Sequence, residues 1–199
     1  MKSTQVWSGW LLAAVLACPT LAQAKTPSPA ATAATLNLSP KAQEAAALLD
    51  ARDSYKRQWA FMRLEALREP ASGALVRSYL THRNPDTRSF AARALAAIEG
   101  QAAIPTLLER LRTDRDSRVR IEILLGLEPL NDPTLLPVFI DMMRDRDSQV
   151  RITALDIVSR IDRPQAKEAV LTRWARERDR DVQRVLPDAL QRVTASSGG

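Results

Sequence analysis

Residues 116–130 read DSRVRIEILLGLEPL, and related stretches occur at four other places in the chain. Each copy opens with an Asp or an Asn, and these openings lie 31, 32, 31 and 32 residues apart, at Asp53, Asn84, Asp116, Asp147 and Asp179. A fixed period of this length is typical of repeat proteins, in which one small structural unit is stacked several times. The sequence therefore predicts a tandem repeat.

Each copy has the apolar pattern of a helix with one buried face. Counting from Val119, the next apolar positions are Ile123, Leu127 and Leu130, at steps of four, four and three residues. Such steps place the side chains on one side of an α-helix, and the opening Asp or Asn suits its N-cap. A second apolar segment precedes each copy, with matching anchors at Leu48, Leu80, Leu111, Met143 and Trp174. Each unit is therefore predicted to be a pair of helices.

A helix pair of this size cannot bury both apolar faces alone, whereas stacked pairs share one continuous core. The fold class predicted is all-α, a right-handed α-solenoid of about five two-helix repeats. Aromatic residues make up only 5% of the chain and glycine only 6 residues, which favours helices over sheets. The repeat domain is predicted over 39–193, because Ser39-Pro40 suits a helix start, and 194–199 is predicted to be a disordered tail.

The first 24 residues have the pattern of a signal peptide. Lys2 precedes the apolar run Trp10–Ala17, and Ala22–Ala24 matches a small-residue cleavage site. The run is too short to cross a bilayer, which takes about 20 apolar residues, so no integral membrane span is expected. We therefore expect a protein exported to the periplasm or secreted, with possible association with the envelope.

Two further features belong to this amino-terminal region. Cys18 follows a segment that resembles a lipobox, so a lipoprotein anchored through Cys18 is a minor alternative to soluble export. Residues 25–38 are rich in Ala, Thr and Pro and are predicted to be a flexible linker.

No recognisable catalytic constellation is present. Cys18 is the only cysteine and would leave with the signal peptide, while the single histidine, His82, lies in a polar turn. Gly-rich phosphate loops are absent, so we predict no metal site, no cofactor and no enzyme activity. The formal net charge of +6 comes from arginines interspersed with acids, which does not indicate a nucleic-acid partner.

The D-x-x-V-R opening resembles that of a known repeat family. Together with the preceding segments Ile104–Leu108 (IPTLL) and Leu136–Ile140 (LPVFI), it is similar to the short HEAT-like repeats of phycobilisome lyases and many bacterial proteins, over residues 39–193. The resemblance implies an α-solenoid that serves as a protein–protein interaction module or scaffold. No catalytic motif of the lyases can be placed on this chain, so a small-ligand or chromophore-handling enzyme that uses the groove as a pocket is kept as the alternative.

An arginine follows the first core position of the second helix in four repeats, at Arg57, Arg88, Arg120 and Arg151. Each lies beside the buried stripe and faces the adjacent repeat, where a guanidinium can bond a capping Asp or a helix carbonyl. We expect a structural ladder between repeats, with an anion-binding stripe as the alternative.

The positions opposite the buried stripe are expected to line the concave side of the solenoid. Ile121, Leu125 and Ile152 form the apolar middle of this surface, and such a patch with a polar rim has the anatomy of a protein-binding site. The alternative is that curvature or the linker buries these residues. The full predicted site, for a protein partner of unknown identity, is Met62, Arg93, Ile121, Leu125, Ile152, Asp156 and Arg184.

Overall fold

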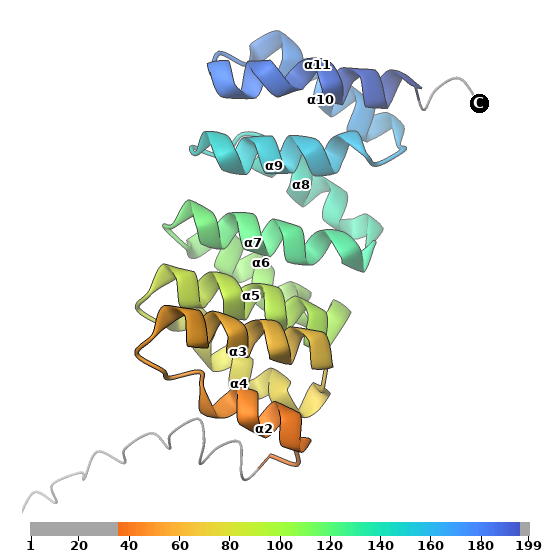
Figure 1. The fold of residues 1–199 in the computed structure, drawn as a ribbon. Helices are drawn as coiled ribbons and strands as arrows, with labels where there is room; N and C mark the ends of the chain where they lie inside the picture. Colours follow the sequence, from red (N-terminus) through yellow and green to blue (C-terminus); the bar gives the residue numbers. More distant parts are fainter. Residues whose placement is uncertain (1–35, 196–199) are drawn as a thin grey trace, which may run out of the picture.

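The computed structural model describes residues 36–195, which form a stack of paired α-helices (Figure 1). Within these residues the secondary structure is helical, without β-strands. The α-helices are α2 Pro40–Ala47, α3 Ser54–Leu67, α4 Gly73–Ser78, α5 Pro85–Glu99, α6 Ile104–Thr113, α7 Ser117–Leu127, α8 Leu136–Met142, α9 Ser148–Ser159, α10 Pro164–Arg176 and α11 Arg180–Ala195. Short 3-10 turns lie between them, at Pro70–Ser72, Tyr79–Thr81, Gly100–Ala103, Glu128–Leu130 and Pro133–Leu135.

The helices alternate between two layers. Helices α3, α5, α7, α9 and α11 lie side by side in one layer, called here the second-helix layer, because each contacts the next. Helices α4, α6, α8 and α10 lie behind them in Figure 1 and belong to the first-helix layer. Each repeat contributes one helix to each layer, so the prediction of an all-α solenoid of two-helix repeats is confirmed.

The predicted helix caps are confirmed. The side chains of Asp53, Asn84, Asp116 and Asp147 accept the amide two residues later at 2.8, 2.8, 3.0 and 2.9 Å, and Asp179 does the same at 2.9 Å. Each cap satisfies one of the amides that the first turn of a helix leaves without a partner. Ser39 caps α2 in the same way, by accepting the amide of Ala42 at 3.3 Å.

The core lies between the two layers. The apolar positions four and eight residues after the first core position of each second helix are buried as predicted, except that Leu190 in the last repeat is half-buried. They are Ala60 and Leu64, Ala91 and Leu95, Ile123 and Leu127, Ala154 and Val158, and Leu186 and Leu190. The apolar position eleven residues after the first core position is buried in two repeats, at Ile98 and Val193, and half-buried in the other three. A repetitive core of small and medium side chains therefore runs the length of the stack.

The prediction for Trp174 is wrong, since this side chain is 48% exposed. Helix α10 buries Ala166 and Val170, and the helical repeat carries that face on to Arg173 and Glu177, where the two form an ion pair. Trp174 lies beside that face instead. Of the other first-helix anchors, Leu80, Leu111 and Met143 are buried, and Leu48 is half-buried.

Helices α5 and α7 approach closely. A Cβ atom at Gly126 would lie 3.0 Å from the Cβ of Ala96, so glycine and alanine let the two helices pack at short range. Because of this approach, Ser89 and Ala96 on α5 are buried, although both occupy positions expected to face outward.

The ends of the domain differ slightly from the prediction. The predicted signal peptide (1–24) and most of the predicted linker (25–38) lie outside the described residues, but Leu38 is buried in the core. Helix α11 extends to Ala195, two residues into the predicted tail. None of the helices within residues 36–195 is long and apolar enough to cross a membrane.

Candidate functional site

The four arginines Arg57, Arg88, Arg120 and Arg151, called here the inner arginine ladder, point into the stack. Each donates from Nη1 to the backbone carbonyl six residues earlier, at 2.5, 2.9, 3.1 and 2.9 Å respectively. The carbonyl lies in the turn that leads into the same helix. Each arginine thus ties the start of its second helix to the preceding turn.

The inner ladder also joins neighbouring repeats through buried acids. Arg88 binds Asp114 through two hydrogen bonds of 2.8 Å, and Arg120 binds Asp145 through bonds of 2.7 and 2.9 Å. Arg151 lies 3.4 Å from Glu177. Each acid belongs to the following repeat, so every pair holds two repeats in register.

The three acids were not recognised from the sequence. Asp114, Asp145 and Glu177 each lie two residues before a helix cap and accept the backbone amide of that cap at 3.1, 2.8 and 2.9 Å. The available signal was the recurrence of an acid at this position in the last three repeats. One carboxylate therefore fixes the turn and pairs with the inner ladder.

Two of these acids, Asp114 and Glu177, have lowered pKa values. Burial raises the pKa of Asp114, but hydrogen bonds from Arg88, from the Asp116 amide and from Arg110 outweigh it and lower the pKa to about 2. The pKa of Glu177 is also lowered, because its bonds to the Asp179 amide and Arg173 outweigh burial. The charges of these acids are therefore paired inside the stack and are not exposed on its surface.

The predicted partner-binding residues all lie on the second-helix layer, but they do not form one apolar patch. Ile121 and Ile152 are half-buried and pack against the core, while Leu125 is 37% exposed. Asp156 pairs with Arg160 at 2.9 Å and Arg192 at 3.2 Å.

Arg184 is strongly exposed and lies 3.5 Å from Asp181, at the end of the stack far from the first repeats. Met62 and Arg93, in contrast, come together on neighbouring helices and line the same groove.

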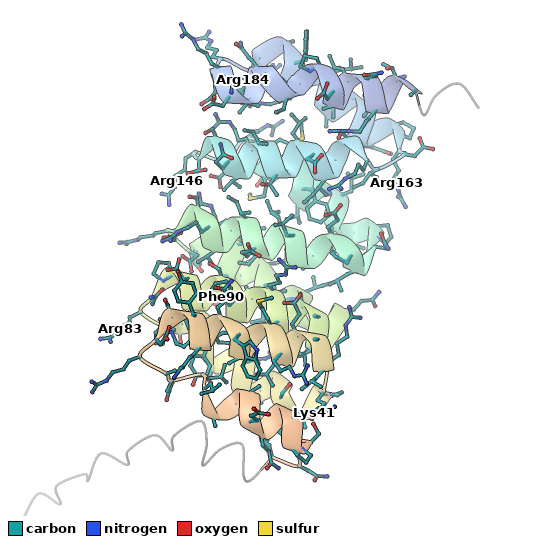
Figure 2. All side chains as sticks on the ribbon, viewed as in Figure 1. Lys41, Arg83, Phe90, Arg146, Arg163 and Arg184 are labelled. Carbon is teal, nitrogen blue, oxygen red and sulfur yellow. The ribbon has the colours of Figure 1, made fainter. Side chains whose placement is uncertain are left out.

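This α3–α5 groove has a volume of ≈ 520 Å³ and involves the first three repeats. Phe61, which is 1% exposed, belongs to the core beneath it, and Phe90 enters from α5, in the front layer of Figure 2. Met62 is 57% exposed at its rim. The complete lining is Gln58, Phe61, Met62, Glu65, Ala66, Arg68, Phe90, Arg93 and Glu122.

Three charged groups from three consecutive second helices converge in the groove. Arg93 Nε donates to Glu65 Oε1 at 3.1 Å, whereas Arg93 Nη1 lies 3.7 Å from Glu122 Oε2, beyond hydrogen-bond distance. Glu122 Oε2 is buried and has no hydrogen-bond partner among residues 36–195. Burial raises the pKa of Glu122; the charge of Arg93 opposes this shift without cancelling it, and Glu65 adds to it. The described residues therefore leave Glu122 Oε2 with only the longer ion pair to Arg93.

The family model for HEAT repeats matches residues 43–128 and 109–191, which together span nearly all of the described helices. The chain belongs to the HEAT repeat family. No curated protein matches it. In this HEAT-repeat protein the match ends within α11, so both layers of the stack belong to the family region.

The single histidine of the HEAT-repeat stack lies in a turn. His82 Nδ1 accepts the amide of Asn84 at 3.1 Å, so in the second repeat the histidine occupies the position of the turn acids. No group of three or more His, Cys, Asp or Glu within residues 36–195 is arranged to hold a metal ion. Two smaller hollows, of ≈ 240 and ≈ 310 Å³, lie toward the carboxyl-terminal repeats, and their linings include none of the predicted partner-binding residues.

Proposed function

We propose that this protein is a non-enzymatic interaction module that binds another protein through the α3–α5 groove. The observation that carries the proposal is the buried Oε2 of Glu122, which makes no hydrogen bond within residues 36–195, in a groove with Met62 exposed at its rim. An unsatisfied buried acceptor costs stability, and a donor supplied by a partner would remove that cost. Burial of Met62 by the same partner would add an apolar contribution.

The exposed apolar surface continues along α3. Tyr55, Trp59 and Met62 are 80%, 44% and 57% exposed, and their spacing of four and three residues places them on one side of the helix, opposite the core. Aromatic residues and methionine are enriched in the centres of protein interfaces. Exposure of three such side chains on one helix favours a protein partner over a small ligand enclosed in the groove.

The groove predicts which groups the partner segment carries. It presents an apolar side chain to Met62 and a donor, such as a lysine, arginine or amide group, to Glu122. Arg93 and Glu65 flank this position and would orient a second polar contact. The remaining predicted residues Leu125, Asp156 and Arg184 would then extend the surface toward the other repeats.

The proposed location is the cell envelope, with the chain exported to the periplasm or secreted. The pattern of residues 1–24 supports this, and the 31–32-residue period supports the short subclass of HEAT-like repeats. Mass spectrometry of the protein purified from its own cells tests the location, since an amino terminus at Lys25 is expected after cleavage. An intact Met1 would contradict export through this signal.

The binding surface is tested by comparing capture of partners from an envelope extract by the mature protein and by two variants. Met62→Asp is expected to lose the partner, because it puts a charge at the rim beside Glu65 and Glu122. Leu171→Asp is the matched control, because Leu171 is 46% exposed on α10, in the other layer. Equal capture by both variants, with native circular dichroism, would refute the groove as the binding site.

A further inference from the structure

A second row of arginines runs along one edge of the stack. It has one member in each repeat, again at steps of 31, 32, 31 and 32 residues, and every member is exposed. Figure 2 shows Arg83 and Arg146 at the same edge of the stack, where the turns enter the second helices. This outer arginine row consists of Arg52, Arg83, Arg115, Arg146 and Arg178.

The turn geometry directs these side chains outward. In four of the five repeats the arginine lies between a residue that faces the stack and a helix cap, and the amide of the cap is bonded to the residue two positions earlier. The inner ladder also bonds the row's own backbone, with donation to the carbonyls of Arg52, Arg83 and Arg146 at 3.0, 3.3 and 3.3 Å. The row is therefore held in place by the same contacts that hold the repeats together.

The charges of the outer row are not used within the described part of the chain. Arg52, Arg83, Arg115 and Arg178 make no side-chain hydrogen bond or ion pair among residues 36–195, and Arg146 donates only to the carbonyl of Arg115, at 2.7 Å. The acids next to these arginines in the chain already have other partners. Asp114, Asp145 and Glu177 pair with the inner ladder, and the capping side chains accept helix amides.

The distance between successive guanidinium groups limits which charged partners can match the row. Stacked helices lie about 8–10 Å apart, so five successive guanidinium groups cover roughly 32–40 Å. An extended segment in the polyproline II conformation has three residues per turn and rises about 3.1 Å per residue, so acids at every third residue recur on one face at about 9 Å. Nucleic acid carries a phosphate about every 3.4 Å of a strand, which is about three times denser than the row.

A lipid surface is also a poorer match. Segments that bind membranes combine basic residues with apolar side chains that enter the bilayer. The three-residue turns 51–53, 82–84, 114–116, 145–147 and 177–179 contain no large apolar side chain. A partner of this edge is therefore expected to be held by charge alone.

We propose that the outer arginine row binds an extended acidic segment of a protein that carries Asp or Glu at about every third residue. The edge lies on the turns and shares no residue with the lining of the α3–α5 groove, so this site is independent of the groove. Each arginine contacts one carboxylate, and the fixed register of the turns supplies the match in spacing.

The test uses fluorescence anisotropy of two labelled synthetic peptides with the mature protein, at 0.15 M salt, where charges more than about 8 Å apart are largely screened. One peptide is five Gly-Ser-Glu triplets, and the other has the same composition with its five glutamates consecutive. The variant is Arg83→Glu with Arg115→Glu, since neither side chain makes a bond within residues 36–195. The control is Lys41→Glu with Arg163→Glu, which changes the net charge equally and lies on the other side of the view in Figure 2.

The spaced peptide is expected to bind more tightly than the consecutive one. The edge variant is expected to lose about tenfold in affinity, because each exposed charge contact contributes up to about fivefold and both are reversed. The control is expected to stay within about twofold. Equal losses in the two variants, or equal binding of the two peptides, would overturn the proposal. Tighter binding of a single-stranded oligonucleotide or of anionic phosphatidylglycerol vesicles at the same edge would overturn the acidic-peptide assignment.

Discussion

Replacing Arg120 by alanine is expected to destabilise the stack by about 3 kcal/mol. The Arg120 and Asp145 side chains are only 5% and 9% exposed and are joined by two hydrogen bonds of 2.7 and 2.9 Å. Removal of one partner leaves the other charge buried without compensation, which costs about 3–5 kcal/mol. We take the lower end because Asp145 keeps the bond from the Asp147 amide.

Such a loss is large against the total stability of a domain, which is about 5–15 kcal/mol. Urea unfolding followed by circular dichroism measures it, with the midpoint and slope compared between wild type and variant. Arg118→Ala is the matched control. Arg118 is 58% exposed and pairs with Asp86 and Asp116 at 2.5 and 3.0 Å, so its loss is expected to cost no more than about 1 kcal/mol.

A double variant separates the charge from the packing. Arg120→Met with Asp145→Asn removes both buried charges, and the new amide oxygen still accepts the Asp147 amide. This variant is expected to be more stable than Arg120→Ala, because no unpaired charge is left inside the stack. If Arg120→Ala costs less than about 1 kcal/mol, or no more than Arg118→Ala, the inner ladder does not hold the repeats together in the way described.

Three further variants test other parts of the structure. Because the pKa of Asp114 falls from 3.8 to about 2 on folding, its contribution of about 2 kcal/mol is present above about pH 4 and lost toward pH 2; Asp114→Asn should flatten this part of a pH titration of stability, and an unchanged slope would contradict it. Glu122 has a raised pKa in the folded state, so the protein loses stability as the pH rises above 4.5 and this carboxyl ionises. Glu122→Gln should therefore raise the melting temperature at pH 7, by the equivalent of roughly 0.5–1 kcal/mol, and a lower melting temperature would refute the claim that ionised Glu122 destabilises the fold. Gly126→Val should cost about 1–3 kcal/mol in urea unfolding by crowding Ala96, whereas a neutral effect would show that α5 and α7 can separate easily.

Much of the architecture could be predicted because its causes are local. The 31–32-residue period, the Asp and Asn caps and the apolar steps of four and three each depend on residues within one helical turn or two. For this reason the helix pairs, their caps and most core positions were predicted correctly. Trp174 was the clearest miss, since its distance from the last unit's core depends on the rotation of α10, which the spacing of anchors does not specify.

The candidate site was less accessible from the sequence. Met62 and Arg93 were singled out as outward-facing positions, but Glu122 joins them only because α5 and α7 lie side by side. The same closeness half-buries Ile121, which periodicity alone places at the surface. How far a side chain opposite the core is covered depends on the separation of neighbouring helices, and no single helix encodes it.

The sequence by itself determined the repeat, the start of each second helix and the positions of the recurring arginines. Only the tertiary structure decided which arginines form ion pairs inside the stack and which lie exposed on the turns. Arg120 and Arg115 lie five residues apart, yet Arg120 turns inward to Asp145 whereas Arg115 turns outward and pairs with no acid among residues 36–195. The reason is that an ion pair between repeats forms across a stacking distance, where the partner is 25 residues away in the chain and close only after the helices have packed.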